Sequence, residues 1–283
     1  MTLVADWPRP HFKPSGGRAS LFYLVFGEPP AHLNVKRARH HVDQLPPELQ
    51  VSIHARTDDA AWFDGWLSNP LGAEIPHVFE TNARSVYAAG RVAAVRGEFD
   101  DPSSLAYLRN TVGVVSAIAE EGAVAVFDVH ALTWWTPQEW RTRFVDRSEF
   151  HIADHIFTAV SREETGETVR MRTRGMKKFG RPELQLRRVP GAPDGNGRAV
   201  HHATEVLSGL ANYMAHGGVI ADGETMHLAR FDASIAFFPA AAEPDASAHF
   251  ENPTLEVCEI DPATGLSGGG ISQLLGRMES AAP

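Results

Sequence analysis

The sequence lacks the residues that several classes of protein require. Its 283 residues include a single cysteine, Cys258, so no internal disulfide can form, and this usage fits a reducing compartment best. No run of 18 apolar residues occurs, and the first residues contain no apolar segment after a basic start. Both absences argue against a membrane span and a secretory signal. We therefore expect a soluble, cytoplasmic protein.

Basic charge and catalytic motifs are also scarce. Lys and Arg number 26 against 35 Asp and Glu, which gives a formal net charge of −9 at pH 7. This balance disfavours nonspecific binding to nucleic acid or to an anionic membrane. The chain has no G-x-S-x-G, H-E-x-x-H or C-x-x-C motif, and Gly268-Gly-Gly270 lacks the spacing of phosphate- or dinucleotide-binding loops. No cofactor is expected.

What is present is a hydrophobic fraction of 43%, enough for a folded core. In the first half, short apolar or alternating runs predict strands at residues 20–27, 50–56, 85–96 and 123–130. Helical spacing and capping signals predict helices over residues 35–45, over 58–68, from Asp101-Pro102 to Gly122, and from the capping box Thr136–Glu139. This order is compatible with a split βαβ, ferredoxin-like module.

The second half predicts a different unit. A hairpin is expected from residues 156–162 and 168–174, further strands at 183–189, 225–229, 233–238 and 254–260, and a surface loop at 191–197. Residues 199–216 predict an amphipathic helix that ends at Gly217-Gly218. We therefore expect an α+β fold with two sheet-and-helix modules, residues 1–148 and 149–262. A Gly-rich tail, residues 263–283, follows and holds a marginal amphipathic turn.

The run from Thr173 to Leu186 places two glycines and a proline between two predicted strands, and Asp222-Gly-Glu-Thr225 follows the predicted helix. Together they resemble a bacterial domain family of unknown function that carries Gly-Leu-x-x-Phe-Gly-x-Pro-Glu-[LI]-Glu, a helix with a late Tyr, and Asp-Gly-Glu-Thr. The matching positions are Gly175, Phe179, Gly180, Pro182, Glu183, Leu184, Tyr213, Asp222, Gly223, Glu224 and Thr225. Met176, Gln185 and Met226-His227 depart from the pattern. The resemblance covers residues 155–228 and implies a fold without implying an activity.

One predicted strand carries a basic face. Because side chains alternate along a strand, Arg170, Arg172 and Arg174 share one side. The loop beyond them adds Lys177, Lys178 and Arg181. This pattern predicts a patch for an acidic protein partner or a phosphate-bearing ligand. The alternative is a solvated face balanced by the nearby acids Glu163, Glu164, Glu167 and Glu183.

Three further sets of residues could carry chemistry. His151, Asp154 and His155 would share a helix face and could ligate a transition metal, whereas a strand would separate Asp154 from the two histidines. Asp128 and His130 end a strand on one face, which suits either a general base oriented by a carboxylate or a structural histidine. Glu183 and Glu224 could perform acid–base work or bind the amides of their own loops.

These observations favour a non-enzymatic binding or accessory protein that recognises another macromolecule, with an immunity- or adaptor-like role as one version. The alternative is a small hydrolase or metal-dependent enzyme that uses Asp128 and His130, or Glu183 and Glu224.

Overall fold

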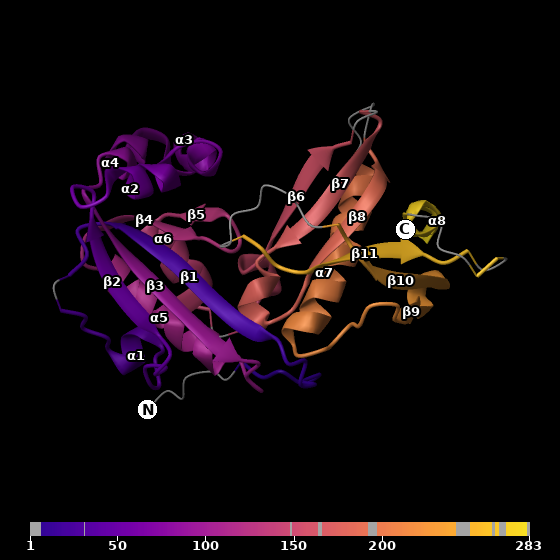
Figure 1. Cartoon of the computed structure of the whole chain (residues 1–283), viewed down its shortest axis with the longest axis horizontal. Coiled ribbons are helices and arrows are strands. Elements are labelled where there is room, and N and C mark those ends of the chain that lie inside the picture. Colours follow the sequence, from indigo (N-terminus) through magenta and orange to yellow (C-terminus); the bar gives the residue numbers. More distant parts are fainter. Residues whose placement is uncertain are drawn as a thin grey trace. The chain divides into compact units, whose positions relative to one another are not determined.

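The chain folds into two compact units that are each built on one sheet (Figure 1). A computed structural model describes residues 7–30, 32–147, 149–163, 166–191, 197–241, 250–261, 264–265 and 270–281. The first unit is built on Gly16–His155 and the second on Ile156–Pro283, and the segment Pro10–Ser15 belongs to the second unit. Helices and two sheets, of five and six strands, confirm the expected α+β class.

The sheet of the first unit has the order β2-β3-β1-β4-β5. Its strands are β1 (Arg18–Gly27), β2 (Gln50–Ala55), β3 (Arg91–Asp100), β4 (Ala123–Asp128) and β5 (Thr133–Trp135). All neighbouring strands are antiparallel. The order β4-β1-β3-β2 is the one that a split βαβ module has. The crossover from β1 to β2, however, carries only the four-residue helix α1 (Arg37–His40), where that module has a covering helix.

Both faces of this sheet are covered by helices (Figure 1). The helices are α2 (Ala60–Leu67), α3 (Ile75–Phe79), α4 (Ala83–Tyr87), α5 (Ala106–Ala119) and α6 (Pro137–Trp140). The Phe22 ring packs edge-on against Trp66 of α2, with centroids 5.6 Å apart, whereas its neighbour Tyr23 packs against Trp140 of α6 at 5.3 Å. Since successive side chains of a strand point to opposite faces, β1 is apolar on both sides and reads as a continuous hydrophobic run.

Two helices of this unit are shorter than the sequence predicts. The helix expected over residues 35–45 is limited to α1 because His41 adopts the left-handed region with φ 55°. The helix expected from Asp101 begins at Ala106. Asp101 has φ 25°, which is incompatible with a right-handed helix, and its carboxylate pairs with Arg9 at 3.1 Å.

The third strand is also displaced from its prediction. It was expected over residues 85–96, but the first residues of that range lie in α4 and β3 begins at Arg91. The short strand β5 was not predicted. The capping box was predicted correctly: the Thr136 hydroxyl accepts the Glu139 N–H at 3.1 Å, and the Glu139 carboxylate accepts the Thr136 N–H at 3.0 Å.

The second unit has a six-stranded sheet in the order β6-β7-β8-β11-β10-β9. Its strands are β6 (Phe157–Arg162), β7 (Thr168–Arg174), β8 (Glu183–Pro190), β9 (Thr225–Leu228), β10 (Ala233–Pro239) and β11 (Thr254–Glu259). Neighbours are antiparallel except for the parallel pair β8–β11. The helix α7 (Arg198–Ala215) packs against β7 and β8. Its apolar face is the predicted one, with Ala203, Val206, Leu207, Leu210 and Met214 buried.

The end of the chain forms a helix, α8 (Ser272–Ala281), where the sequence predicted only a marginal turn. Leu274, Leu275 and Met278 are buried, and α8 packs against α7. Glu259 at the end of β11 accepts the Leu274 N–H at 2.8 Å, so a carboxylate from the sheet binds the first turn of the helix. Most of the predicted loop at 191–197, together with Glu164, Gly268 and Gly269, lies outside the described residues.

Candidate binding groove

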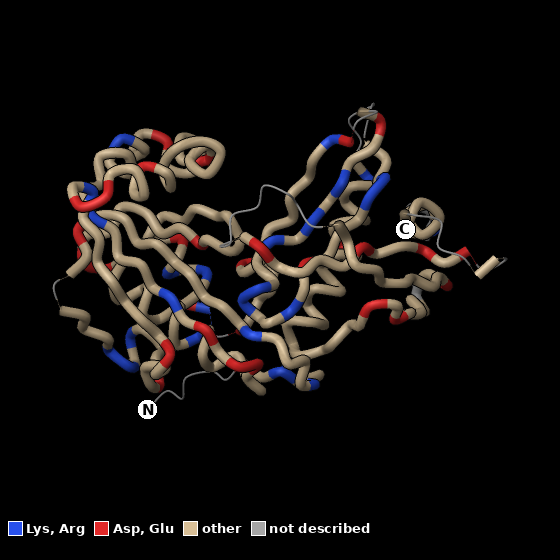
Figure 2. The backbone as a smooth tube through the Cα atoms, viewed as in Figure 1, with Lys and Arg blue, Asp and Glu red and all other residues tan. Residues whose placement is uncertain are grey.

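Alternation of side chains gives the second sheet a polar face opposite α7. Arg172 of β7 lies opposite Gln185 of β8, which in turn lies opposite Glu256 of β11. Directly opposed residues carry their side chains on the same face, so these three form one row. Met171 and Leu186, which also oppose each other, are buried on the face that α7 covers. Figure 2 shows basic residues recurring along β7 and β8.

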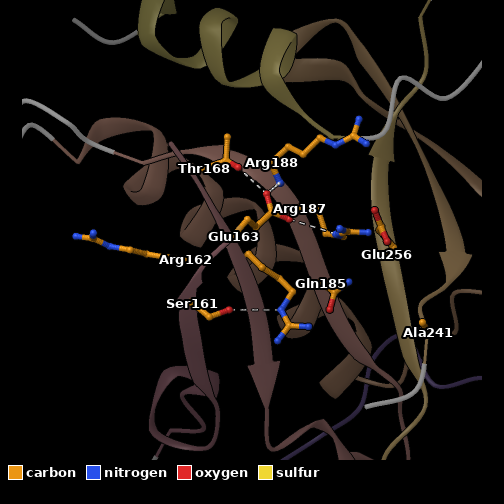
Figure 3. Close-up of a pocket in the computed structure, with 10 residues that line it drawn as sticks. Ser161, Arg162, Glu163, Thr168, Gln185, Arg187, Arg188, Ala241 and Glu256 are labelled. Carbon is orange, nitrogen blue, oxygen red and sulfur yellow. Dashed lines mark hydrogen bonds and ion pairs between the residues drawn. The ribbon is translucent and has the colours of Figure 1, made fainter. Parts of the chain in front are cut away.

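A groove of about 810 Å³ lies on this polar face (Figure 3). Four arginines and two glutamates are among its lining residues, which are Ser161, Arg162, Glu163, Thr168, Arg170, Gln185, Arg187, Arg188, Ala241 and Glu256. The arginines come from three neighbouring strands, β6, β7 and β8. Their excess over the glutamates makes this surface locally basic, although the chain as a whole is acidic.

Glu163 is held in place at one end of the groove. Its carboxylate accepts hydrogen bonds from the Thr168 hydroxyl at 2.6 Å, the Arg188 N–H at 3.1 Å and Arg187 Nε at 3.3 Å. Burial raises the pKa of Glu163, but these hydrogen bonds and the Arg187 charge lower it more, so that the net pKa shift is downward. Glu163 is therefore ionised at neutral pH and balances part of the arginine charge.

The predicted arginine face is divided between the groove and the protein interior. Arg170 lines the groove, and its Nε donates to the Ser161 hydroxyl at 3.4 Å. Arg172 is 8% exposed and lies between Ala159 of β6 and Gln185 of β8. Arg174 donates to the carbonyl of Phe250 at 3.4 Å. Of the three, Arg170 is the residue that the structure places at the groove.

The loop residues of the predicted patch, Lys177, Lys178 and Arg181, also differ in how far they are buried. Lys178 and Arg181 are buried, at 0% and 2% exposure, which removes both from any binding surface. Arg181 donates to the carbonyls of Lys13, Gly217 and Gly218, so its guanidinium ties its own loop to two other backbone segments. Lys177 is half-buried in the loop and is not among the groove residues.

Three groove arginines that the predicted patch did not include are Arg162, Arg187 and Arg188. Arg162 precedes the hairpin turn and Arg187 follows the glycine-containing loop. The signal that could have found Arg187 is the antiparallel pairing of β7 with β8, which carries the basic face of one strand onto the next.

The motif acid Glu183 has a structural position. Its carboxylate accepts the N–H groups of Gly175 and Met176 at 3.1 and 3.0 Å, the Thr173 hydroxyl at 2.7 Å and the Asn252 amide at 3.2 Å. Burial raises the pKa of Glu183, and hydrogen bonds from Thr173 and Asn252 offset part of that rise. Gly175 has φ 113°, a conformation that glycine adopts readily, so glycine and glutamate together set the shape of this loop.

The other carboxylates considered as candidates for acid–base work also bind amides of their own turns. Glu224 is exposed and accepts the Ala221 N–H at 2.8 Å. Asp128 is buried and accepts the N–H groups of His130 and Ala131, each at 3.1 Å. These contacts close the turns that follow a helix and a strand. A structural role is therefore enough to explain why carboxylates occupy these positions.

The candidate metal ligands His151, Asp154 and His155 do not converge on one point. Asp154 is buried and its carboxylate pairs with Arg143 and Arg147 at 3.0 and 2.9 Å. The His155 ring stacks on Phe150 with centroids 5.1 Å apart, whereas His151 is exposed. Among the described residues, no group of three or more His, Cys, Asp or Glu side chains could hold a metal ion.

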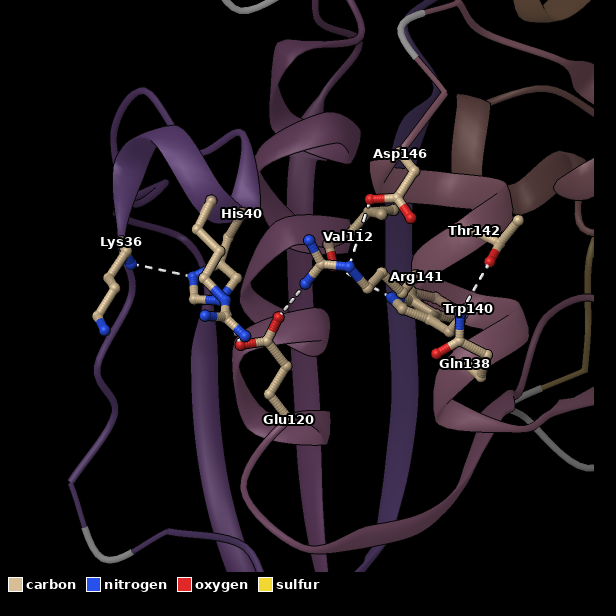
Figure 4. Close-up of polar contacts among 10 residues, drawn as sticks. Lys36, His40, Val112, Glu120, Gln138, Trp140, Arg141, Thr142 and Asp146 are labelled. Carbon is tan, nitrogen blue, oxygen red and sulfur yellow. Dashed lines mark hydrogen bonds and ion pairs between the residues drawn. The ribbon is translucent and has the colours of Figure 1, made fainter.

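A second polar cluster lies in the first unit, at the end of α5 (Figure 4). Glu120 pairs with Arg39 at 2.7 Å, with His40 Nε2 at 3.2 Å and with Arg141. His40 Nδ1 accepts the Lys36 N–H at 2.9 Å, so Nε2 carries the proton that is donated to Glu120. Burial raises the pKa of Glu120, but the hydrogen bonds and charges of Arg39 and His40 lower it by more, so the net pKa shift is downward. The cluster fixes α1 to α5.

No helix within the described part of the chain is long and apolar enough to cross a membrane. The likeness of residues 155–228 to the bacterial domain family stays a prediction. No family model matches the chain, and comparison with curated proteins and with solved structures gives no match either.

Proposed function

We propose that the protein is a binding module whose second unit takes an acidic segment of a partner protein into the arginine-lined groove. The observation that carries this proposal is the presence of four arginines, Arg162, Arg170, Arg187 and Arg188, among the residues that line one groove. Guanidinium groups bind carboxylates through two parallel hydrogen bonds, which gives both affinity and orientation. An adaptor- or immunity-like protein would use such a groove to capture its partner.

The acidic chain as a whole favours a protein partner over a nucleic acid. A net charge of −9 repels a polyanion that follows the surface over many residues. A short acidic segment, by contrast, contacts only the locally basic groove and so avoids most of this repulsion. The candidate catalytic carboxylates bind amides of their own turns, and these described contacts are the kind that a structural role requires, which supports a binding module over a hydrolase.

The proposal is tested by titrating a fluorescein-labelled peptide of about ten residues, the upper end of the usual strand length, in which Glu and Thr alternate. The double variant Arg162→Glu, Arg170→Glu reverses two groove charges and is expected to weaken binding by about tenfold or more. Arg198→Glu is the matched control, because Arg198 is an exposed arginine on α7 outside the groove lining. Equal affinity of the double variant and the control would refute the proposal.

A further inference from the structure

β6 forms an outer edge of the second sheet. It pairs with β7 on one side, and no other described strand pairs with its outer side. Edge strands are usually protected by proline, by several charges or by a bulge. β6 has no proline and one charged residue, Arg162 at its end, while Phe157 and Val160 are 45% and 50% exposed. The edge is therefore chemically suited to pairing with another extended segment.

The pairing of β6 with β7 shows which backbone groups face this edge. The Glu163 N–H donates to the Thr168 carbonyl at 3.0 Å, so these two residues form a hydrogen-bonded pair. Opposed residues alternate between hydrogen-bonded and non-bonded pairs along an antiparallel ladder. Ser161, two residues before Glu163, therefore also directs its backbone N–H and C=O groups toward β7. Val160 and Arg162 therefore direct their N–H and C=O groups outward, as does Thr158.

The groove opens on the same side of the sheet as the side chain of Ser161. Ser161 opposes Arg170, and Arg170 Nε donates to the Ser161 hydroxyl, so the guanidinium lies over β6 rather than over the sheet centre. A strand added to β6 would lie about 4.8 Å away. An acidic side chain on that strand, opposite Ser161, would come within reach of Arg170.

We infer that the partner segment binds as an added strand along β6 and places alternate acidic side chains in the groove. The inference rests on the proposed function, since it names how the acidic segment is held. Backbone hydrogen bonds to Thr158, Val160 and Arg162 supply affinity, and the arginines select acidic side chains. A second copy of β6 would bring Arg162 and Arg170 toward the same charges, so charge complementarity selects an acidic partner.

Two methylated forms of the Glu/Thr peptide test this inference. In an added antiparallel strand, the residues with Glu in the groove point their N–H groups away from β6, and the Thr residues between them donate to β6. Methylation of every Thr nitrogen is expected to weaken binding by about tenfold or more, because several hydrogen bonds are lost. Methylation of every Glu nitrogen is expected to leave binding within about twofold. A parallel strand would give the reverse order, which also supports strand addition.

Equal binding of the two methylated peptides would overturn the added strand. Amide exchange gives an independent measurement on the protein, because the outward N–H groups of Val160 and Arg162 become protected only if a strand pairs with them. Suppose that the double arginine variant no longer binds the unmodified peptide, while the wild-type protein binds both methylated forms equally. The groove then binds acidic side chains, and the inference of an added strand is wrong. If the arginine variant binds as well as its control, the proposed function itself fails.

Discussion

Replacing Glu183 with alanine is expected to destabilise the second unit strongly. The carboxylate accepts four hydrogen bonds, from the Gly175 and Met176 N–H groups, the Thr173 hydroxyl and the Asn252 amide, and it is 2% exposed. A buried donor left without a partner costs about 1–3 kcal/mol. Because losses at neighbouring groups are not additive, we expect a total of about 3–5 kcal/mol.

The assay must distinguish the two units. All six tryptophans lie in the first unit, so their emission during urea unfolding reports on that unit and serves as an internal reference. Amide exchange of peptides from β7 and β8 reports on the second unit. Glu224→Ala is the control, because Glu224 is exposed and binds one amide, and it is expected to cost less than about 1 kcal/mol. A Glu183→Ala loss as small as that of the control would show that these contacts do not stabilise the fold.

Two further predictions follow from the contacts described above. Because the folded pKa of Glu120 lies below its value of 4.5 in the unfolded chain, its contribution to stability is present above about pH 4.5 and is lost as the pH falls through the folded pKa. Glu120→Gln is expected to flatten this acid limb in tryptophan-monitored urea titrations, and an unchanged limb would exclude Glu120 as its source. Gly217→Ala is expected to cost about 2 kcal/mol or more, because φ is 100° and a Cβ would collide with the Phe12 backbone. A Cβ at Gly209 in α7 would meet only open space, so Gly209→Ala is expected to stabilise the second unit by about 0.5–1 kcal/mol. Amide exchange that shows Gly217→Ala to be the more stable of the two variants would contradict this reasoning.

The elements that the sequence predicts well are those whose own side chains determine their burial. The helix α7 has one apolar stripe, and its predicted residues are the buried ones. β1 and the β6–β7 hairpin likewise carry their pattern within a few residues. The Thr136–Glu139 capping box is closed by two residues three apart, so no distant partner is needed to fix it.

The elements that were misplaced depend on partners far away in the chain. Asp101 followed by Pro102 is a good helix start locally, yet a salt bridge to Arg9 and a positive φ hold Asp101 outside α5. Arg181 was predicted to lie in an exposed basic patch, yet its guanidinium is buried and binds the carbonyl of Lys13, 168 positions away. Spacing along the chain carries no information about such contacts, because they form only once separate segments have packed.

The candidate site shows the same division between local pattern and pairing. Alternation places Arg170 and Arg172 on one face, but the flanking strands bury Arg172 and leave Arg170 at the groove. The hydrogen bonds of Glu183 fix the loop between β7 and β8, and that loop sets the register that brings Arg187 onto the same face as Arg170. If the groove binds as proposed, the glycine- and glutamate-containing motif would act on binding through strand register. Glu183→Ala should therefore weaken binding of the acidic peptide as well as the fold, whereas Glu224→Ala should leave binding unchanged and cost less than about 1 kcal/mol of stability.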